Sequence, residues 1–183
     1  MSRPHGDKLA RFREGDAEAF AQLVAEMGPR LKGYFLRQGA QPATAEDLTQ
    51  NVFLRTLQGK SRYHEEGRLE AYFLRIARNL WIDHRRRRRP VVGDEDLGVV
   101  EGMQAGPVET AAVRDRAERL RAALRELDPD SHEILELAVL QRLAYRDVAA
   151  ILEIPVGTVK SRVFYALRRL RQRLDGSGME EEE

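Results

Sequence analysis

Hydrophobic residues recur every three or four positions along most of the chain, and no stretch alternates convincingly between apolar and polar residues. This spacing predicts helices rather than strands. Near the N-terminus, Asp16 is the expected N-cap of a helix whose apolar face lies within residues 19–27. Gly28 and Pro29 are expected to end that helix, and a second helix is predicted over residues 30–38.

Two further helices are predicted in the first half of the chain. Thr44 and Asp47 resemble a capping box with Asp in place of Glu, opening a helix that Gly59 would end. Residues 60–67 are polar and indicate a turn. The longest predicted helix runs from Leu69 to about Arg88, where its apolar stripe meets a block of arginines.

Charge is distributed in blocks that the net charge of +1 conceals. Residues 71–90 contain seven arginines and one acid, and residues 155–174 contain six basic residues and no acid. Between them, residues 91–110 contain five acids and no base. Two cationic segments of this kind favour binding to a polyphosphate at two places, although arginine-rich helix faces are often merely solvated.

The acidic segment also contains repeated glycines, so we interpret residues 91–111 as a flexible linker. The predicted fold class is therefore all-α, with two small helical domains on either side of this linker. Periodicity resumes near Ala112, along a helix that Asp128-Pro129 would end. Ser131 or Asp130 would cap the next helix. Its inner face is expected to consist of Ile134, Leu135, Ala138 and Val139.

Residues 144–170 show the spacing of a helix-turn-helix. The inner face of a short first helix is predicted to consist of Tyr145, Val148, Ala149 and Leu152. Glu153–Pro155 supplies the break, Val156 opens the second helix, and Val159 would face the core. The alternative is an ordinary antiparallel helix pair with a solvated basic surface.

The second helix of this motif carries the candidate DNA contacts. Donors and rings that could reach base edges in a major groove come from Lys160, Ser161, Phe164 and Tyr165. Phosphate contacts are better placed at Thr158, Arg162, Arg168 and Arg169. Phe164 and Tyr165 have a second interpretation, because aromatic residues at helical spacing are more often part of a core.

Other classes of function find little support in the sequence. No apolar run approaches the roughly 20 residues of a membrane span, no signal peptide follows Met1, and cysteine is absent. We therefore expect a cytoplasmic protein without membrane insertion. The four histidines are scattered and no metal or nucleotide motif occurs, so no cofactor, metal site or enzymatic activity is predicted.

The motifs at Leu127–Pro129, Tyr145–Ala149 and Val156–Arg162 together resemble the fourth conserved region of extracytoplasmic-function sigma factors of the sigma-70 superfamily. Ala45–Leu54 is similar to the segment of its second region that docks on the clamp helices of RNA polymerase. Tyr72–Leu80 resembles its promoter-melting helix.

The resemblance implies a division of labour along the chain. Residues 8–90 would bind core RNA polymerase and recognise and melt the −10 element of promoter DNA. Residues 91–111 would be the linker, residues 112–175 would read the −35 element, and residues 176–183 would form an acidic disordered tail. An anti-sigma factor is a further implied partner. A stand-alone regulator, with N-terminal helices for dimerisation or ligand sensing, remains the alternative.

The resemblance also implies individual roles in the first half of the chain. Contacts with the polymerase clamp would come from Asp47, Gln50 and Phe53, although Asp47 would equally cap a helix and Phe53 would equally be core. Contacts with −10 DNA would come from Arg62, Tyr63, His64, Arg78 and Asn79. The first three lie in a loop that captures a flipped base, or in an ordinary polar turn. Tyr72 and Trp81 fall on the apolar stripe and fit a core.

Two departures from the family pattern stand in the second half. Glu153 occupies a turn position where the family commonly has glycine, so the backbone there must avoid a left-handed conformation or tolerate its cost. Tyr165 stands where members often carry arginine, which leaves the −35 sequence preference open.

Overall fold

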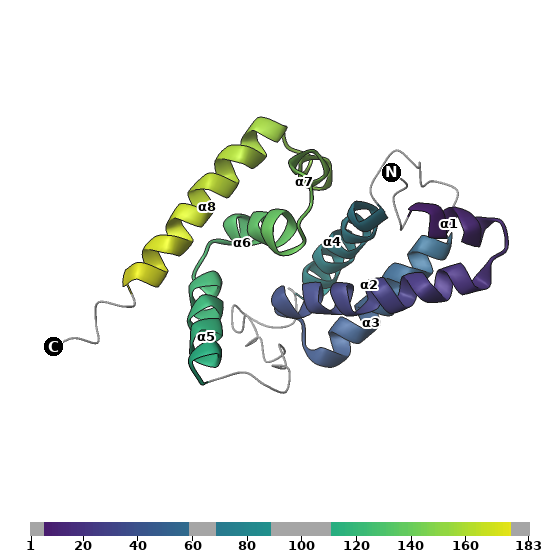
Figure 1. The fold of residues 1–183 in the computed structure, drawn as a ribbon, viewed down its shortest axis with the longest axis horizontal. Coiled ribbons are helices and arrows are strands. Elements are labelled where there is room, and N and C mark those ends of the chain that lie inside the picture. Colours follow the sequence, from purple (N-terminus) through teal and green to yellow (C-terminus); the bar gives the residue numbers. More distant parts are fainter. Residues whose placement is uncertain (1–5, 59–68, 89–110, 177–183) are drawn as a thin grey trace. The chain divides into compact units, whose positions relative to one another are not determined.

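The structure is a computed structural model that describes residues 6–58, 69–88 and 111–176 (Figure 1). All regular elements in these ranges are helices, as the periodicity predicts. The chain separates into two units with the boundary between Met103 and Gln104. The loop that carries Arg62, Tyr63 and His64, the predicted linker up to residue 110 and the tail beyond residue 176 lie outside the described residues.

The described residues of the N-terminal unit form four helices. They are α1 (Gly6–Arg13), α2 (Ala17–Arg37), α3 (Pro42–Gln58) and α4 (Leu69–Arg88). Helix α2 packs against the other three, and α3 also packs against α4. The largest fully buried side chains include Leu9, Leu23, Leu31, Tyr34, Phe35 and Phe73. Asp16 caps α2 as predicted, since its carboxylate accepts a hydrogen bond of 3.0 Å from the Ala19 N–H.

Helix α2 is continuous, so the prediction that Gly28 and Pro29 end a helix is wrong. A proline inside a helix removes a backbone hydrogen bond and crowds the preceding turn, at a cost of about 3 kcal/mol. The buried stripe nevertheless continues in phase from Leu23 through Met27 to Leu31, all at most 2% exposed. Burying each such side chain contributes about 1.5–3 kcal/mol, which offsets the proline. Gly28 helps because it has no Cβ to clash with the proline ring.

Helix α3 begins at Pro42, so the predicted capping box at Thr44 is wrong. The Ala45 N–H already donates to the Gln41 carbonyl at 2.8 Å, which places the first turn before Thr44. Proline suits the first helical position, because the N–H that it lacks would have no acceptor within the helix.

Five helical segments lie within residues 111–176 of the C-terminal unit. They are α5 (Ala111–Arg125), α6 (Pro129–Leu135), the π-helical η2 (Glu136–Leu140), α7 (Tyr145–Leu152) and α8 (Val156–Gly176). Helix α8, yellow-green in Figure 1, packs against α5, α6 and α7. The side chains with no exposed surface are Ile134, Leu137, Val148 and Val159, together with Glu136. Their burial anchors one face of α8.

Asp128 caps α6, so the prediction of Ser131 or Asp130 as the cap is wrong. The Asp128 carboxylate accepts a hydrogen bond of 2.9 Å from the Ser131 N–H. Pro129 holds the first helical position, where its fixed φ is already helical. The Asp-Pro pair therefore opens a helix as well as following the end of the previous one.

The π-helical segment η2 changes which side chains face inward. Its wider turn adds a residue to the helical repeat, so a stripe extrapolated from α6 falls out of register. Val139, predicted to be inside, is 42% exposed, and Leu137 is fully buried instead. Glu136 is also buried, and Gln141 donates a side-chain hydrogen bond of 2.9 Å to its carboxylate.

Candidate nucleic-acid interface

Helices α7 and α8 form the predicted helix-turn-helix, and Glu153 takes the left-handed conformation at its turn. The Glu153 backbone has φ 56° and ψ 41°, which costs a residue with a Cβ roughly 1–2 kcal/mol. The Ile154 N–H donates to the Ala149 carbonyl at 3.1 Å and closes α7. The Val159 N–H donates to the Pro155 carbonyl at 3.1 Å and opens α8.

Packing of α8 against its neighbours decides which of its faces meets solvent. Its buried residues are Val159, Val163 and Ala166, and α7 contributes Val148, Ala149 and Ile151. Val159 thus faces the core as predicted, whereas Tyr145 is 38% exposed and lies outside the inner face expected for it. The side of α8 opposite these buried residues remains available for a ligand.

An outward stripe on α8 combines two aromatic rings with polar and basic side chains. Ser161, Phe164, Tyr165 and Arg168 follow the i, i+3, i+4, i+7 spacing of one helix face, and Lys160 flanks them. Phe164 is 62% and Tyr165 58% exposed, so the core interpretation is wrong for both. Their rings lie edge to face with centroids 5.4 Å apart. Adjacent large rings left in solvent indicate a binding surface.

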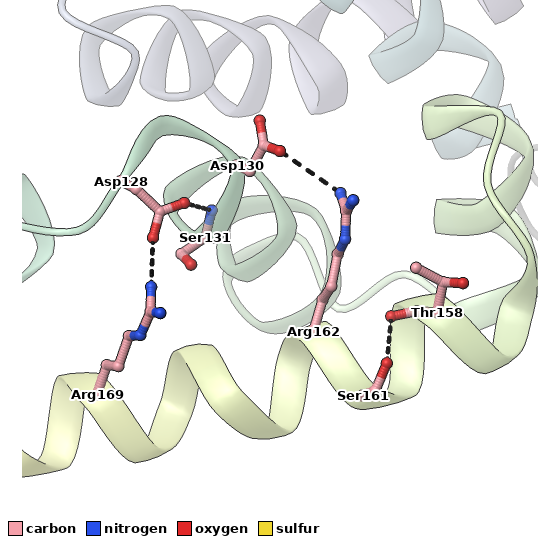
Figure 2. A network of polar contacts seen from close by, with 7 residues as sticks. All are labelled: Asp128, Asp130, Ser131, Thr158, Ser161, Arg162 and Arg169. Carbon is pink, nitrogen blue, oxygen red and sulfur yellow. Dashed lines mark hydrogen bonds and ion pairs between the residues drawn. The ribbon is translucent and has the colours of Figure 1, made fainter.

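A second face of α8 points its arginines at acids of the same domain (Figure 2). The pairs are Arg169 with Asp128 at 2.8 Å, Arg162 with Asp130 at 3.6 Å, and Arg173 with Glu126. Lys160 and Arg168, by contrast, make no ion pair within the part of the chain that the structure describes. The three arginines predicted to contact phosphates therefore fall into two classes, with Arg162 and Arg169 paired and Arg168 not.

Asp128 is charged at neutral pH. The hydrogen bond from the Ser131 N–H lowers the pKa of Asp128, and the Arg169 guanidinium lowers it further. Both interactions favour the carboxylate form, so the contact between Asp128 and Arg169 is a pair of full charges.

Thr158 and Ser161 stand at the N-terminal end of α8. The Ser161 hydroxyl donates to the Thr158 carbonyl at 3.1 Å (Figure 2). Ser161 is exposed and Thr158 is half-buried. The Ser161 oxygen thus keeps its acceptor capacity on the outward stripe.

Helix α4 places Arg78 and Asn79, the two of its residues predicted to meet −10 DNA, near its centre. Asn79 is exposed and Arg78 is half-buried. Trp81 is 9% exposed and its ring stacks on His84 with centroids 5.6 Å apart, which confirms the core interpretation. Tyr72 is half-buried.

Further along α4, the arginines whose side chains the structure describes lie in solvent. Arg85, Arg86 and Arg87 are all exposed. Arg86 lies 3.7 Å from the Asp83 carboxylate one turn earlier. This end of α4 therefore forms a concentrated positive surface.

Phe53, a predicted polymerase contact, lies in the core of the N-terminal unit. It is 8% exposed, and its ring packs edge-on against Phe20 and Phe73, with centroids 6.1 Å and 5.6 Å away. Its position fixes α3 against α2 and α4.

The outer face of α3 carries the other two predicted polymerase contacts. Asp47 and Gln50 are exposed. Leu54, which sequence reasoning missed, is 53% exposed and stands seven residues after Asp47, on the same face. The seven-residue spacing from Asp47 could have placed Leu54 on the outer face, but an apolar residue next to a buried stripe is ordinarily assigned to the core.

Within residues 6–58, 69–88 and 111–176 no group of three or more His, Cys, Asp or Glu side chains could hold a metal ion. Among the described helices, none is both long enough and apolar enough to cross a bilayer.

Comparison with known proteins finds two family models that match in order along the chain. Sigma-70 region 2 matches residues 23–91, and sigma-70 region 4 matches residues 117–170. The ECF RNA polymerase sigma factor EcfG of Rhodopseudomonas palustris is 33% identical over 84% of this chain and 83% of its own length. The RNA polymerase sigma factor CarQ of Myxococcus xanthus is 31% identical over 91% of this chain and 95% of its own length.

A solved structure is similar over most of the chain. It is the sigma factor RpoE of Bartonella quintana in complex with the anti-sigma factor NepR, with a TM-score of 0.70 and 25% identity. The similarity covers 87% of this chain and 98% of that one. The two-domain helical fold is therefore shared with a solved sigma factor.

Proposed function

This chain belongs to the extracytoplasmic-function sigma factors of the sigma-70 family, which direct transcription initiation, and we propose that its two helical domains divide promoter recognition between them. Residues 8–90 bind core RNA polymerase and recognise and melt the −10 element. Residues 112–175 read the −35 element. Residues 91–111 connect the two domains, and residues 176–183 form an acidic tail.

The outward stripe of α8 is the observation that carries this proposal for the −35 element. A major groove accepts a helix, and its base edges offer hydrogen-bond groups and thymine methyls. Phe164 and Tyr165 present apolar rings to those methyls, while Lys160 and Ser161 present polar atoms. The opposite face of α8 is buried, so only this side can enter the groove without unfolding the domain.

Arg168 is the first residue to which we assign a phosphate contact beside the groove. It lies on the outward stripe and makes no ion pair within the described residues. Thr158, at the start of α8, is a second phosphate ligand near the opposite end of the contact. Arg162 and Arg169, which the sequence assigns to phosphates, reach DNA only by leaving Asp130 and Asp128.

In the N-terminal domain, the proposal places melted −10 DNA along α4. Asn79 is exposed on this helix, Arg78 is half-buried beside it, and the following arginine block is the positive surface on which the phosphates lie. Base capture by Arg62, Tyr63 and His64 rests on the family resemblance, since that loop lies outside the described residues.

Polymerase docking is assigned to the exposed face of α3. Asp47 and Gln50 supply polar contacts and Leu54 supplies an apolar one. Phe53 supports this face from beneath, because its buried ring holds α3 in place. The clamp helices of core polymerase are the proposed partner.

Regulation is proposed to follow the family as well. The structure of the Bartonella quintana factor contains an anti-sigma factor, and we assign a partner of that class to this chain. The chain acts in the cytoplasm, where it contributes binding and DNA melting and no covalent chemistry.

The experiment is transcription in vitro with purified core polymerase, full-length protein and a library of random promoters. Core polymerase alone should give no selected promoter, and addition of the chain should enrich a defined −35 and −10 pair. Phe164→Ala and Tyr165→Ala should then shift the enriched −35 sequence, while Gln172→Ala, an exposed change near the end of α8, should not.

Polymerase binding is tested in parallel. Asp47→Ala with Gln50→Ala should weaken assembly of the holoenzyme, and Glu46→Gln, a change at the neighbouring exposed residue, should not. Promoter-specific footprints from the isolated chain, combined with no binding to core polymerase, would contradict the proposal and favour a stand-alone regulator.

A further inference from the structure

The basic residues of α8 differ in whether they form ion pairs with acidic side chains of the same domain. Arg162 and Arg169 reach from α8 to Asp130 and Asp128 at the start of α6, as Figure 2 shows. Arg168, next in sequence to Arg169, points from the outward stripe and pairs with no acid among the described residues. A difference of one residue in the helix thus decides whether a guanidinium meets an internal carboxylate.

Asp128 and Asp130 already bind the guanidinium groups with which Arg169 and Arg162 would contact DNA. A guanidinium binds a carboxylate and a phosphate through the same planar donors. Asp128 and Asp130 therefore act toward Arg169 and Arg162 as phosphate oxygens would. DNA that recruits either arginine must break an existing pair before it forms a new one.

These pairs are weak enough to yield to DNA but present whenever DNA is absent. The Asp128 and Asp130 side chains are 43% and 76% exposed, and solvated ion pairs contribute little to stability. The pairs affect the free energy of DNA binding, because they exist in the free protein and must break when DNA binds. Loss of each pair therefore offsets part of the free energy gained when the arginine contacts a phosphate.

We propose that Asp128 and Asp130 are specificity-determining residues that limit sequence-independent DNA binding by holding Arg169 and Arg162 against the domain. This inference rests on the proposed function, in which α8 enters the major groove of the −35 element. Backbone contacts supply the affinity for any sequence, and base contacts supply discrimination. Withholding two arginines from phosphates raises the share of binding that depends on Phe164 and Tyr165.

The test measures binding of full-length protein to a short fluorescent duplex of random sequence over a range of salt concentrations. Asp128→Asn and Asp130→Asn remove the charges. Asparagine caps helices as well as aspartate does, so the first change keeps the start of α6 intact. We expect each change to tighten binding about threefold and the double change about tenfold, with a salt slope steeper by up to about two.

Two controls separate release of the arginines from a change in net charge. Asp115→Asn removes one negative charge that pairs with Arg119 within α5, and it should alter binding less than twofold. In a chain that already carries Arg162→Ala and Arg169→Ala, the double aspartate change should tighten binding only by the net-charge effect that Asp115→Asn measures. A gain in that background as large as in the unaltered one, or a double variant that binds as the unaltered chain does, overturns the inference.

The proposed function is tested separately by the holoenzyme. If the unaltered chain supports transcription from its selected promoter while the aspartate variants bind random duplex unchanged, the inference alone fails. If no promoter is selected with core polymerase, the proposed function fails, and with it the inference.

Discussion

The two domains contain the same local device, an aspartate that caps a helix and also holds an arginine, but they connect it differently. In the N-terminal domain, Asp16 caps α2 and accepts hydrogen bonds of 3.0 and 2.6 Å from Arg11. In the C-terminal domain, Asp128 caps α6 and accepts one of 2.8 Å from Arg169.

The difference lies in where the arginine comes from. Arg11 is five residues from Asp16 and belongs to the neighbouring helix α1, so that pair closes a local corner. Arg169 is 41 residues from Asp128 and belongs to the helix proposed to read DNA. The same carboxylate geometry stabilises a corner in one domain and withdraws a cation from a nucleic-acid surface in the other.

The two domains also differ in which residues take the left-handed backbone conformation. The N-terminal domain places glycine there, at Gly15 with φ 103° and Gly39 with φ 92°. The C-terminal domain places Arg142 at φ 54° and Glu153 at φ 56°. Residues with a Cβ are strained in this conformation, so among the described residues the C-terminal domain carries a cost that the N-terminal domain does not.

Replacement of the arginines is expected to have the largest effect, on DNA binding. Arg168→Ala should weaken binding to random duplex roughly tenfold at low ionic strength, because it removes a direct phosphate contact. Arg169→Ala should change it less than twofold, because Asp128 already engages that guanidinium. Arg11→Ala serves as the control with no DNA effect. Equal losses for the two neighbouring residues would break the distinction between them.

The next effect concerns the caps. Asp128→Ala should lower the unfolding free energy of the C-terminal domain by about 1 kcal/mol, while Asp128→Asn should leave it nearly unchanged. Asp16→Ala should lower the unfolding midpoint of the N-terminal domain. Trp81 is the sole tryptophan of the sequence and lies in α4, so its fluorescence follows the N-terminal domain and circular dichroism follows both. A shift of the tryptophan transition by Asp128→Ala would show that the domains unfold together.

Local signals predicted much of this structure. The Asp16 cap follows from a short acidic side chain just before an apolar stripe, and α4 follows from its long periodic pattern. The helix-turn-helix followed in the same way, from its spacing around Pro155. In each of these cases the deciding interaction lies within a few residues along the chain.

Features set by distant contacts were missed. Pro29 stays inside α2 because α1, α3 and α4 cover one continuous stripe, which no local rule about proline contains. Phe164 could be core or interface until the position of α7 and α6 on α8 was known. Arg168 and Arg169 are the same residue type in adjacent positions, and only acids some 40 residues away along the chain distinguish them.

A smaller effect tests the left-handed residues. Glu153→Gly should stabilise the C-terminal domain by about 0.5 kcal/mol, since relief of backbone strain exceeds the entropy that glycine adds to the unfolded chain. Glu153→Ala keeps the Cβ and should have almost no effect. Urea unfolding followed by circular dichroism measures both. A loss of stability in the glycine variant would mean that the Glu153 side chain makes a contribution larger than the strain.

The smallest effect is the response to acid, and it should be parallel in the two domains. Hydrogen bonds from the Ala19 N–H and Arg11 lower the pKa of Asp16 from 3.8. Hydrogen bonds from Ser131, together with the positive charge of Arg169, lower the pKa of Asp128 from 3.8. A carboxyl whose pKa is lower in the folded state stabilises that state fully above pH 3.8, and this contribution is lost as the pH falls through 3.8 toward the folded value. Asp16→Asn should therefore weaken the fall of the N-terminal unfolding midpoint at acid pH, as followed by tryptophan fluorescence. Asp128→Asn should weaken the corresponding fall of the C-terminal unfolding midpoint. Neither change should alter the pH dependence of the other domain. Both carboxylates are solvated, so the changes are modest. An unfolding midpoint that falls as steeply at acid pH in either variant would show that the charge of that capping carboxylate adds nothing to the stability of its domain.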